Sequence, residues 1–319
     1  MPSISLKKSA RKALRKRISK RNLFNLIWAI FRGILLFGLV FMILYPLIVK
    51  FSTSIKSVAD QANPSVMFIP EHPTLRNYKV VYDVVEYPKT LMYTILFTGF
   101  NSLLQIASCS MVAYGLARFK FKLNKPVFAL TILTLIIPPQ ALLLPTYLRF
   151  KYFNPLQLFK FSGGLSGLDI TGTVLPFFIL SLTAMALKNG LYIFMLRQYF
   201  RNIPDTLEEA AYVDGSGIFH TFIRIMLPGA LPIILSMFLF SFVWQWNDNY
   251  YVTTLANNLP TLGNKLFGLQ FSVLGDNSDI FNAVLNTPKF YLLILPLIVL
   301  YIFTQRFFIE SIEKSGTVG

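Results

Sequence analysis

Six long apolar stretches constrain what this chain can fold into. A helix rises about 1.5 Å per residue and the hydrocarbon of a bilayer is about 30 Å thick, so about 20 largely apolar residues cross it. The stretches run approximately over residues 33–49, 90–113, 127–148, 173–196, 231–246 and 290–304. Only 14% of the 319 residues are charged and 54% are hydrophobic, a composition that disfavours a water-soluble enzyme or a disordered chain. The sequence therefore predicts an all-α, polytopic membrane helical bundle with six transmembrane helices.

Basic residues indicate how this bundle is oriented. Nine of the 30 Lys and Arg residues precede Phe24, and the short segment from Arg118 to Lys125 carries four bases and no acid. Positive loops stay in the cytoplasm, so we expect both termini and residues 197–229 inside the cell, and residues 50–89, 149–172 and 247–289 outside. The basic N-terminal segment also suits anionic lipid headgroups better than nucleic acid.

The same reasoning divides the chain into three parts. We expect a basic cytoplasmic tail over residues 1–23, a six-helix transmembrane domain over residues 24–305 and a cytoplasmic tail over residues 306–319. The chain has one cysteine and two histidines, and none of them has metal-ligand spacing, so we predict no metal site.

Polar residues inside the apolar stretches indicate faces that avoid lipid. Asn101, Gln105 and Ser108 recur at helical spacing in the second stretch, where they would be unfavourable against acyl chains. Lys188 and Asn189 lie inside the fourth stretch. Lys188 either faces a cavity or extends its stem to the headgroups, and the sequence leaves both readings open.

Two further features predict a solute pathway. The third stretch is interrupted by prolines at positions 138, 139 and 145, next to Gln140, and such a break in a helix often lines a cavity. The end of the fifth stretch has aromatic and amide side chains suited to sugar rings and hydroxyls, although the aromatic ones are also typical anchors at the membrane interface. These residues are Trp244, Gln245, Trp246, Asn247 and Tyr250.

The segment from Ile203 to Pro232 has the pattern of a helix, a turn and a second helix. Pro204 suits a first helical turn, acidic residues favour the positive end of a helix, and Asp214-Gly215 supplies a stop. Ala210 and Ala211 leave little side-chain bulk on the short helix between Pro204 and Gly215. The Glu209 carboxylate is available to a basic partner. We expect a compact knob that enters a groove of another protein.

The same segment resembles the permease subunits of binding-protein-dependent ABC importers. Their signature is Glu-Ala-Ala, three residues, Gly, nine residues, then Ile-x-Leu-Pro, and it is matched here from Glu209 to Pro228. Five further segments resemble the carbohydrate, maltose-type branch of this family: PTLRNY, AYGLARFKF, IPPQALLLP, MLRQYFRNIP and the C-terminal QRFFIESIEKSGTVG. Nearly the whole chain is covered, and residues 153–172 are longer than is usual there.

The resemblance implies the type I ABC importer permease fold and a mechanism in which the helix around Glu209 docks into a cytoplasmic ATPase. It implies coupling residues Glu208, Glu209, Ala210, Ala211, Asp214, Gly215, Ile225, Leu227 and Pro228. The residues that we assign to the substrate pathway are Asn101, Gln105, Gln140, Lys188, Asn189, Trp244 and Asn247.

The resemblance also implies partners. We expect a second, different permease subunit, two ATPase subunits and an extracytoplasmic solute-binding protein, in a bacterial or archaeal cell membrane. The chain lacks a Gly-x-x-x-x-Gly-Lys-Ser/Thr loop, so ATP and Mg would bind the ATPase, this chain would hold no cofactor, and it would not be an enzyme.

Other function classes remain open. The importer would carry an oligosaccharide or related carbohydrate, or alternatively a non-sugar solute. An ion-coupled secondary carrier would function without an ATPase and would need acidic relay residues in several spans, which are almost absent here. A membrane scaffold or insertase would leave the matched loop without a purpose.

Overall fold

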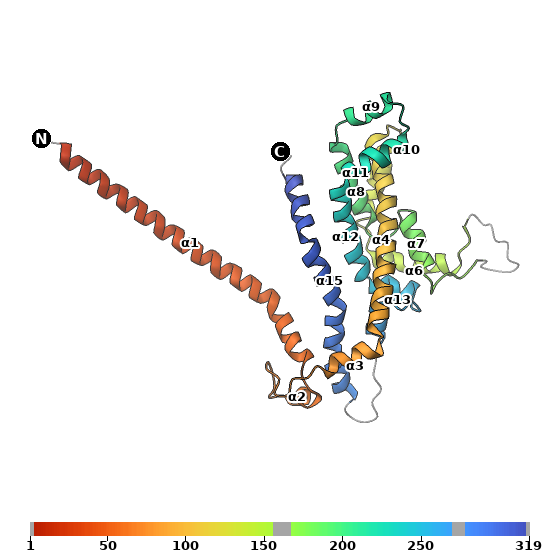
Figure 1. Cartoon of the computed structure of the whole chain (residues 1–319), viewed down its shortest axis with the longest axis horizontal. Coiled ribbons are helices and arrows are strands. Elements are labelled where there is room, and N and C mark those ends of the chain that lie inside the picture. Colours follow the sequence, from red (N-terminus) through yellow and green to blue (C-terminus); the bar gives the residue numbers. More distant parts are fainter. Residues whose placement is uncertain (1–2, 156–166, 270–277, 317–319) are drawn as a thin grey trace. The chain divides into compact units, whose positions relative to one another are not determined.

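The computed structural model describes residues 3–155, 167–269 and 278–316, and the side chains of residues 23–155, 167–269 and 280–305. Two compact units are distinguished: residues 1–77 with 273–288, and residues 78–272 with 289–319. The helices follow one another along the chain as labelled in Figure 1, and the described residues form no β-strand beyond an isolated bridge between Phe153 and Leu168. The predicted helical fold is confirmed.

The first unit begins with one long helix, α1, from Ser3 to Ser54. The expected N-terminal tail and the first apolar stretch are thus a single helix. A short helix, α2 (Val58–Ala62), follows and is capped by Ser57, whose hydroxyl accepts a hydrogen bond from the backbone of Asp60 at 3.1 Å. Helix α3 (Arg76–Val84) leads into the second unit, and helix α15 (Ser278–Gly316) begins in the first unit and ends in the second.

The second unit is organised around α4 (Tyr87–Arg118). This helix packs against α7 (Leu175–Leu182), α8 (Asn189–Asn202) and α12 (Leu231–Trp246). Its small and aromatic residues, including the free and buried Cys109, form a core with large apolar side chains of α8 and α12. Close packing of small residues suits helix contacts in a bilayer.

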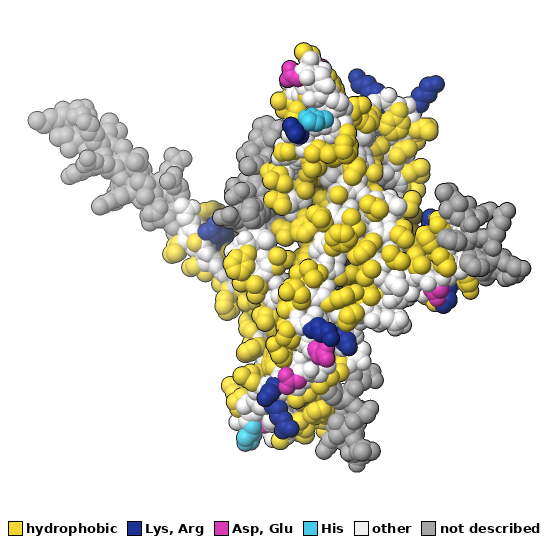
Figure 2. Space-filling model, turned by 45° about the vertical axis from the view of Figure 1, so that its right-hand side comes forward, with side chains coloured by type: hydrophobic (Ala, Val, Ile, Leu, Met, Phe, Trp, Pro, Cys, Tyr) yellow, Lys and Arg dark blue, Asp and Glu magenta, His cyan; other side chains and the backbone are white. Residues whose placement is uncertain are grey.

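Three helices among the described residues are long and apolar enough to cross a membrane: Leu23–Ser54, Tyr87–Arg118 and Ile280–Gln305. A fourth candidate is a pair bent by 80°, Ile218–Gly229 followed by Leu231–Trp246. On the face that Figure 2 shows, hydrophobic side chains cover most of the described surface and charged side chains are few. The count of six spans stays a prediction.

The third and fourth apolar stretches are each divided into two helices. The third becomes α5 (Asn124–Leu133) and α6 (Pro139–Lys151). The break lies just ahead of Pro139, as the prolines predict, whereas Pro145 stays inside α6. The fourth becomes α7 and α8, separated by residues 183–188. The sequence does not predict this break, because residues 183–188 contain no proline. Ala184 and Lys188 have positive φ angles of 55° and 66° there.

Candidate functional site

The segment matched to the importer signature forms the predicted helix, turn and helix. Helix α9 (Thr206–Val213) is followed by α10 (Ile218–Thr221), a π-helical turn over Phe222–Met226 and α11 (Leu227–Gly229). Gly215 joins α9 to α10 with φ +82°, a backbone conformation that favours glycine. The glycine therefore ends α9 for the reason that the sequence indicated.

Helix α9 is fixed to the end of α4 by a buried carboxylate. The Tyr114 hydroxyl donates a hydrogen bond of 2.7 Å to Oε1 of Glu208, and Nε of Arg118 lies 3.1 Å from Oε2 of Glu208. Arg118 also pairs with Asp205 and donates a 2.6 Å hydrogen bond to the carbonyl of Ile203. We call Tyr114, Arg118, Asp205 and Glu208 the α4–α9 anchor.

The acidic residues at the start of α9 have different surroundings. Asp205 does not cap α9 through its side chain but pairs with Arg118 instead. Glu208 is turned inward and buried, whereas its neighbour Glu209 is exposed. Glu208 therefore contacts the end of α4, and Glu209 is a carboxylate that remains accessible to a partner.

The outer side of the same elements is apolar. Leu207, Val213, Ile218 and Phe219 expose 49%, 87%, 53% and 66% of their surface. Glu209, Ala210 and Asp214 are exposed as well, while Ala211 is buried against the rest of the chain. Apolar side chains beside free carboxylates are typical of a protein-binding surface. We call Leu207, Glu209, Val213 and Phe219 the α9 surface.

Ile225, Leu227 and Pro228 lie on the return from this surface toward α12. Ile225 and Leu227 are half-buried and Pro228 is exposed. The Tyr199 hydroxyl of α8 donates a 2.8 Å hydrogen bond to the carbonyl of Gly229. These signature residues thus join the loop to the helical body and are not part of α9 itself.

A cavity of about 580 Å³ lies within the second unit. It is bounded by α4, the start of α6, the break between α7 and α8, the end of α12 and α13 (Asn249–Leu255). Six of the seven residues predicted for the substrate pathway line it: Asn101, Gln105, Gln140, Lys188, Trp244 and Asn247. The structure therefore brings together polar residues from four separate stretches of sequence.

Asn189, the seventh of these residues, lies behind the cavity wall. It is buried, and its side-chain oxygen accepts a hydrogen bond from Nε2 of Gln105. Trp246 was expected to have the character of a sugar-binding residue, but it is buried and donates a 3.1 Å hydrogen bond to the carbonyl of Leu293. Trp246 therefore fixes α12 to α15 and is not among the residues that line the cavity, since it lies on another face of α12 from Trp244.

Hydrogen bonds between amides and hydroxyls hold the polar wall together. Nε2 of Gln105 donates to the carbonyl of Leu187 at 2.7 Å, and Oε1 of Gln105 accepts from Ser241 at 2.6 Å and from Gln245 at 2.7 Å. Asn101 bonds Gln245 and accepts a 2.6 Å hydrogen bond from Ser181. A connected network of this kind fixes the orientation of each amide.

The cavity also contains residues that sequence reasoning missed. Ser181 and Tyr251 line it, and Ser241 supports its wall. The Tyr251 hydroxyl donates a 2.8 Å hydrogen bond to the carbonyl of Pro139, which ties α13 to α6. The one signal in the sequence for these residues was a polar side chain, Ser181, within an apolar stretch.

One basic and one acidic residue are found among the described residues that line this cavity. Nζ of Lys188 lies 4.6 Å from the centre of the Trp244 ring, a cation–π contact. Asp248 caps α13 by accepting a 3.0 Å hydrogen bond from the backbone of Tyr251. Burial raises the pKa of Asp248 to about 6, although hydrogen bonds from the backbones of Tyr251 and Tyr250 oppose the rise.

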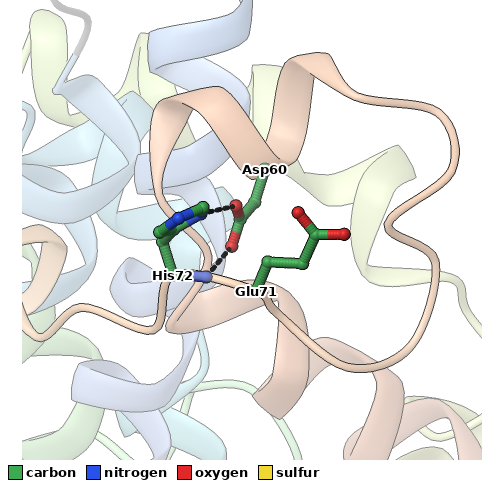
Figure 3. A group of neighbouring side chains, drawn as sticks. All are labelled: Asp60, Glu71 and His72. Atoms are coloured by element: carbon green, nitrogen blue, oxygen red, sulfur yellow. Dashed lines mark hydrogen bonds and ion pairs between the residues drawn. The ribbon is translucent and has the colours of Figure 1, made fainter.

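In the first unit, Asp60, Glu71 and His72 come together (Figure 3). Their potential ligand atoms lie within 4.8 Å of one another. His72 donates a 2.9 Å hydrogen bond from its backbone to the buried Asp60, and its Nδ1 lies 3.1 Å from Oδ1. Burial acts to raise the pKa of Asp60, but these hydrogen bonds outweigh it and hold the pKa below its usual range.

Sequence reasoning missed this group because an irregular loop separates Asp60 from His72. The loop is held by Nζ of Lys56, which donates to the carbonyls of Val66 at 2.6 Å and Met67 at 3.0 Å. Among the described residues, the hydrogen bonds between Asp60 and His72 hold the two ends of this loop together without a bound ion. The absence of a metal site stays a prediction.

The family of the chain follows from a comparison with known proteins. Residues 109–309 match the model of the binding-protein-dependent transport system inner membrane component. The chain belongs to this family. The matched region contains α9, its anchor to Arg118 and most of the cavity lining.

Several relatives of this transport component are similar along most of their length. The melibiose/raffinose/stachyose import permease protein MelC of Bacillus subtilis (strain 168) is 28% identical over 276 residues, which cover 86% of this chain and 91% of MelC. The arabinooligosaccharides transport system permease protein AraQ of the same organism is 27% identical over 260 residues, covering 81% of each chain. The polygalacturonan/rhamnogalacturonan transport system permease protein YtcP, also from that organism, is 23% identical over 94% of this chain and all of YtcP.

A solved structure shares the fold of this transport component. It is a chain of a bacterial ABC transporter involved in the import of the acidic polysaccharide alginate. The TM-score is 0.70 with 20% identity, and the match covers 88% of this chain and 96% of the other. The arrangement of helices described above is therefore that of an ABC importer permease.

Proposed function

We propose that this chain is the translocation subunit of an ATP-driven importer that moves an oligosaccharide or related carbohydrate into the cytoplasm. The relatives named above are permeases for melibiose, raffinose and stachyose, for arabinooligosaccharides and for polygalacturonan. The observation that carries the mechanism is the α9 surface, exposed and apolar, on a helix whose other side is anchored to Arg118.

In this mechanism α9 transmits force because it is held rigidly on one side and free on the other. A partner that seats on the α9 surface and moves would pull on Glu208, and through the ion pair with Arg118 on the end of α4. Helix α4 supplies Asn101 and Gln105 to the cavity. Movement at the loop is therefore passed directly to a helix that lines the solute cavity.

The partners follow from the same mechanism. Two ATPase subunits would bind ATP and Mg and dock at α9 in this chain and at the equivalent helix of a second, different permease. A solute-binding protein would deliver the carbohydrate from outside, to residues 50–89 and 247–289. Both termini would be cytoplasmic, and this chain would have no catalytic activity.

The cavity supplies the solute pathway in this proposal. The exposed amides of Gln140 and Asn247 would bond sugar hydroxyls. Trp244 and Tyr250, which expose 52% and 55% of their surface, would provide faces for sugar rings. The alternative is an importer for a non-sugar solute. A carbohydrate is favoured because amides and exposed aromatic rings share one cavity wall.

The test is made with the assembled transporter. Glu209→Lys should reverse the charge offered to the ATPase and lower both co-purification of the ATPase and solute-stimulated ATP hydrolysis, by about tenfold or more. Asp83→Lys is the matched control for co-purification of the ATPase, since Asp83 is also an exposed acid but lies on α3, in the segment that we assign to the solute-binding protein and not to the ATPase. Normal co-purification and normal uptake with Glu209→Lys would refute the docking role.

An ion-coupled carrier is separated by the same assay. It would transport solute in liposomes that contain this chain without any ATPase. Our proposal expects no uptake there, and uptake only when ATP and the ATPase subunits are present.

A further inference from the structure

The break between α7 and α8 places a lysine where a lysine is unfavourable. Lys188 has φ +66°, which crowds the β-carbon of any residue other than glycine. It is also the N-cap residue of α8, at the positive end of a 14-residue helix, where a cation is repelled. Backbone conformation and the helix dipole both disfavour a lysine at position 188. The reason for a lysine here must therefore lie in the surroundings of its side chain.

Among the side chains that the structure describes, no carboxylate pairs with this cation. Within the part of the chain that the structure describes, the ion pairs involve Lys89, Arg118, Lys151 and His72, and Lys188 is in none of them. Its Nζ lies 4.6 Å over the Trp244 ring instead. A lysine within an apolar stretch that lacks a counter-ion is unusual and marks a functional position.

Asp248, the acidic residue of the cavity lining, is not the counter-ion of Lys188. Asp248 is already the N-cap of α13, where its Oδ1 accepts from the backbone of Tyr251. Its pKa is raised to about 6 by burial, so its charge is itself disfavoured in this environment. Among the described residues, the cavity therefore has one base without a carboxylate partner and one acid that is bonded to the backbone.

The size and lining of the cavity indicate what kind of anion fits. About 580 Å³ suits a ligand much larger than an inorganic ion. Trp244 and Tyr250 present aromatic faces, and Gln140 and Asn247 present exposed amides, on the same lining as Lys188. The lining combines contacts for sugar rings and hydroxyls with one for a negative charge.

We infer that Lys188 is the carboxylate-binding residue of a subsite for acidic oligosaccharides, in which a uronate group of the solute pairs with Nζ while its ring packs on Trp244. This inference rests on the proposed function and adds the charge of the solute to it. The α8 N-terminus and Lys188 both stabilise a carboxylate that approaches from the cavity.

The experiment measures binding to the permease directly, because the solute-binding protein would impose its own selectivity. The complete transporter, without its binding protein, is placed in lipid nanodiscs and titrated with trigalacturonate and with the same trisaccharide after reduction of its carboxyl groups. Saturation-transfer NMR gives the two dissociation constants. We expect the acidic probe to bind at least about tenfold more tightly, as one charge-assisted contact implies.

Variants assign the difference to Lys188. Lys188→Gln should abolish the preference for the acidic probe, while Lys188→Arg retains it. Lys125→Gln is the matched control, because Lys125 is an exposed lysine of α5 that does not line the cavity and lies outside the segments assigned to the solute-binding protein. Elution volume and melting temperature of each assembly verify that the variants are folded.

The outcomes distinguish this inference from the proposed function. Equal affinity for both probes, or a preference that persists in Lys188→Gln, overturns the inference and leaves a saccharide importer intact. Binding of neither probe also overturns it. If the wild-type chain does not co-purify with an ATPase and shows no saccharide-stimulated ATP hydrolysis, the proposed function itself is contradicted.

Discussion

Arg118, the last residue of α4, lies with its Nε 3.1 Å from Oε2 of Glu208 in α9, and both side chains expose only 9% of their surface. The contact joins residues 90 positions apart in the sequence. It ties the helix that lines the cavity to the helix that carries the α9 surface. This pair, together with the contacts of Tyr114 and Asp205, therefore couples the two helices.

Removing one partner of this pair should be costly. Arg118→Ala leaves the Glu208 carboxylate buried without its cation, and breaking a buried pair costs about 3–5 kcal/mol. We expect a clear fall in melting temperature and weaker coupling of ATP hydrolysis to solute. The control is Lys89→Ala, whose pair with Glu86 is exposed on both sides and is worth about 0–1 kcal/mol. Equal stability of the two variants would show that the anchor does not hold α9.

Gly215 should tolerate a side chain poorly for reasons of backbone conformation alone. No atom lies within 4 Å of a β-carbon at this position, so a clash is not the cause, but its φ of +82° strains any L side chain. Gly215→Val should destabilise the loop by about 1–2 kcal/mol and reduce ATPase binding. Gly217→Ala is the matched control, since its surroundings are equally open and its φ is −75°. Similar ATPase affinity in the two variants would argue against a conformational role.

The amide of Gln105 should matter more than its volume. Gln105→Leu removes the donor to Leu187 and the acceptor of Ser241 and Gln245, and leaves buried polar groups unpaired at about 1–3 kcal/mol each. We expect lower thermal stability and a loss of solute-stimulated ATP hydrolysis. Ser102→Ala provides the contrast, because the Ser102 hydroxyl is buried without a hydrogen-bond partner among the described residues. That substitution should be neutral or slightly stabilising, and the network is unimportant if both variants behave alike.

Stability should depend on the protonation of Asp248. Its folded-state pKa of about 6 lies above the ordinary value of 3.8, so the folded chain binds a proton more tightly than the unfolded chain. The contribution of Asp248 to stability is therefore full below about pH 4 and is lost as pH rises to about 6, a change on the order of 1–3 kcal/mol. Melting temperatures of the assembly between pH 4 and 8 measure this change.

Asp248→Asn isolates that dependence. Asn still caps a helix but does not titrate, so the difference in melting temperature between wild type and Asp248→Asn should vary between pH 4 and pH 6 and be constant above pH 7. A difference that stays constant over the whole range would contradict a raised pKa.

Features that depend on neighbouring residues could be predicted from the amino-acid sequence. Apolar stretches of sufficient length predicted a helical membrane protein, and the spacing from Glu209 to Pro228 predicted the helix, turn and helix with Gly215 at the stop. Helical spacing placed Asn101 and Gln105 on one face of α4, where they line the cavity. These predictions succeed because helical period, glycine conformation and hydropathy are local properties.

Contacts between residues far apart in the chain could not be predicted from the sequence. The sequence indicates that Arg118 belongs to a basic loop that sets orientation, but its side chain pairs with the buried carboxylate of Glu208. The sequence allows Lys188 to face a cavity or to reach the headgroups, and the break before α8 places it over Trp244. Asp60 meets His72 through an irregular loop. A charge or amide carries no mark of its partner in the local sequence, because that partner is selected by how whole helices pack.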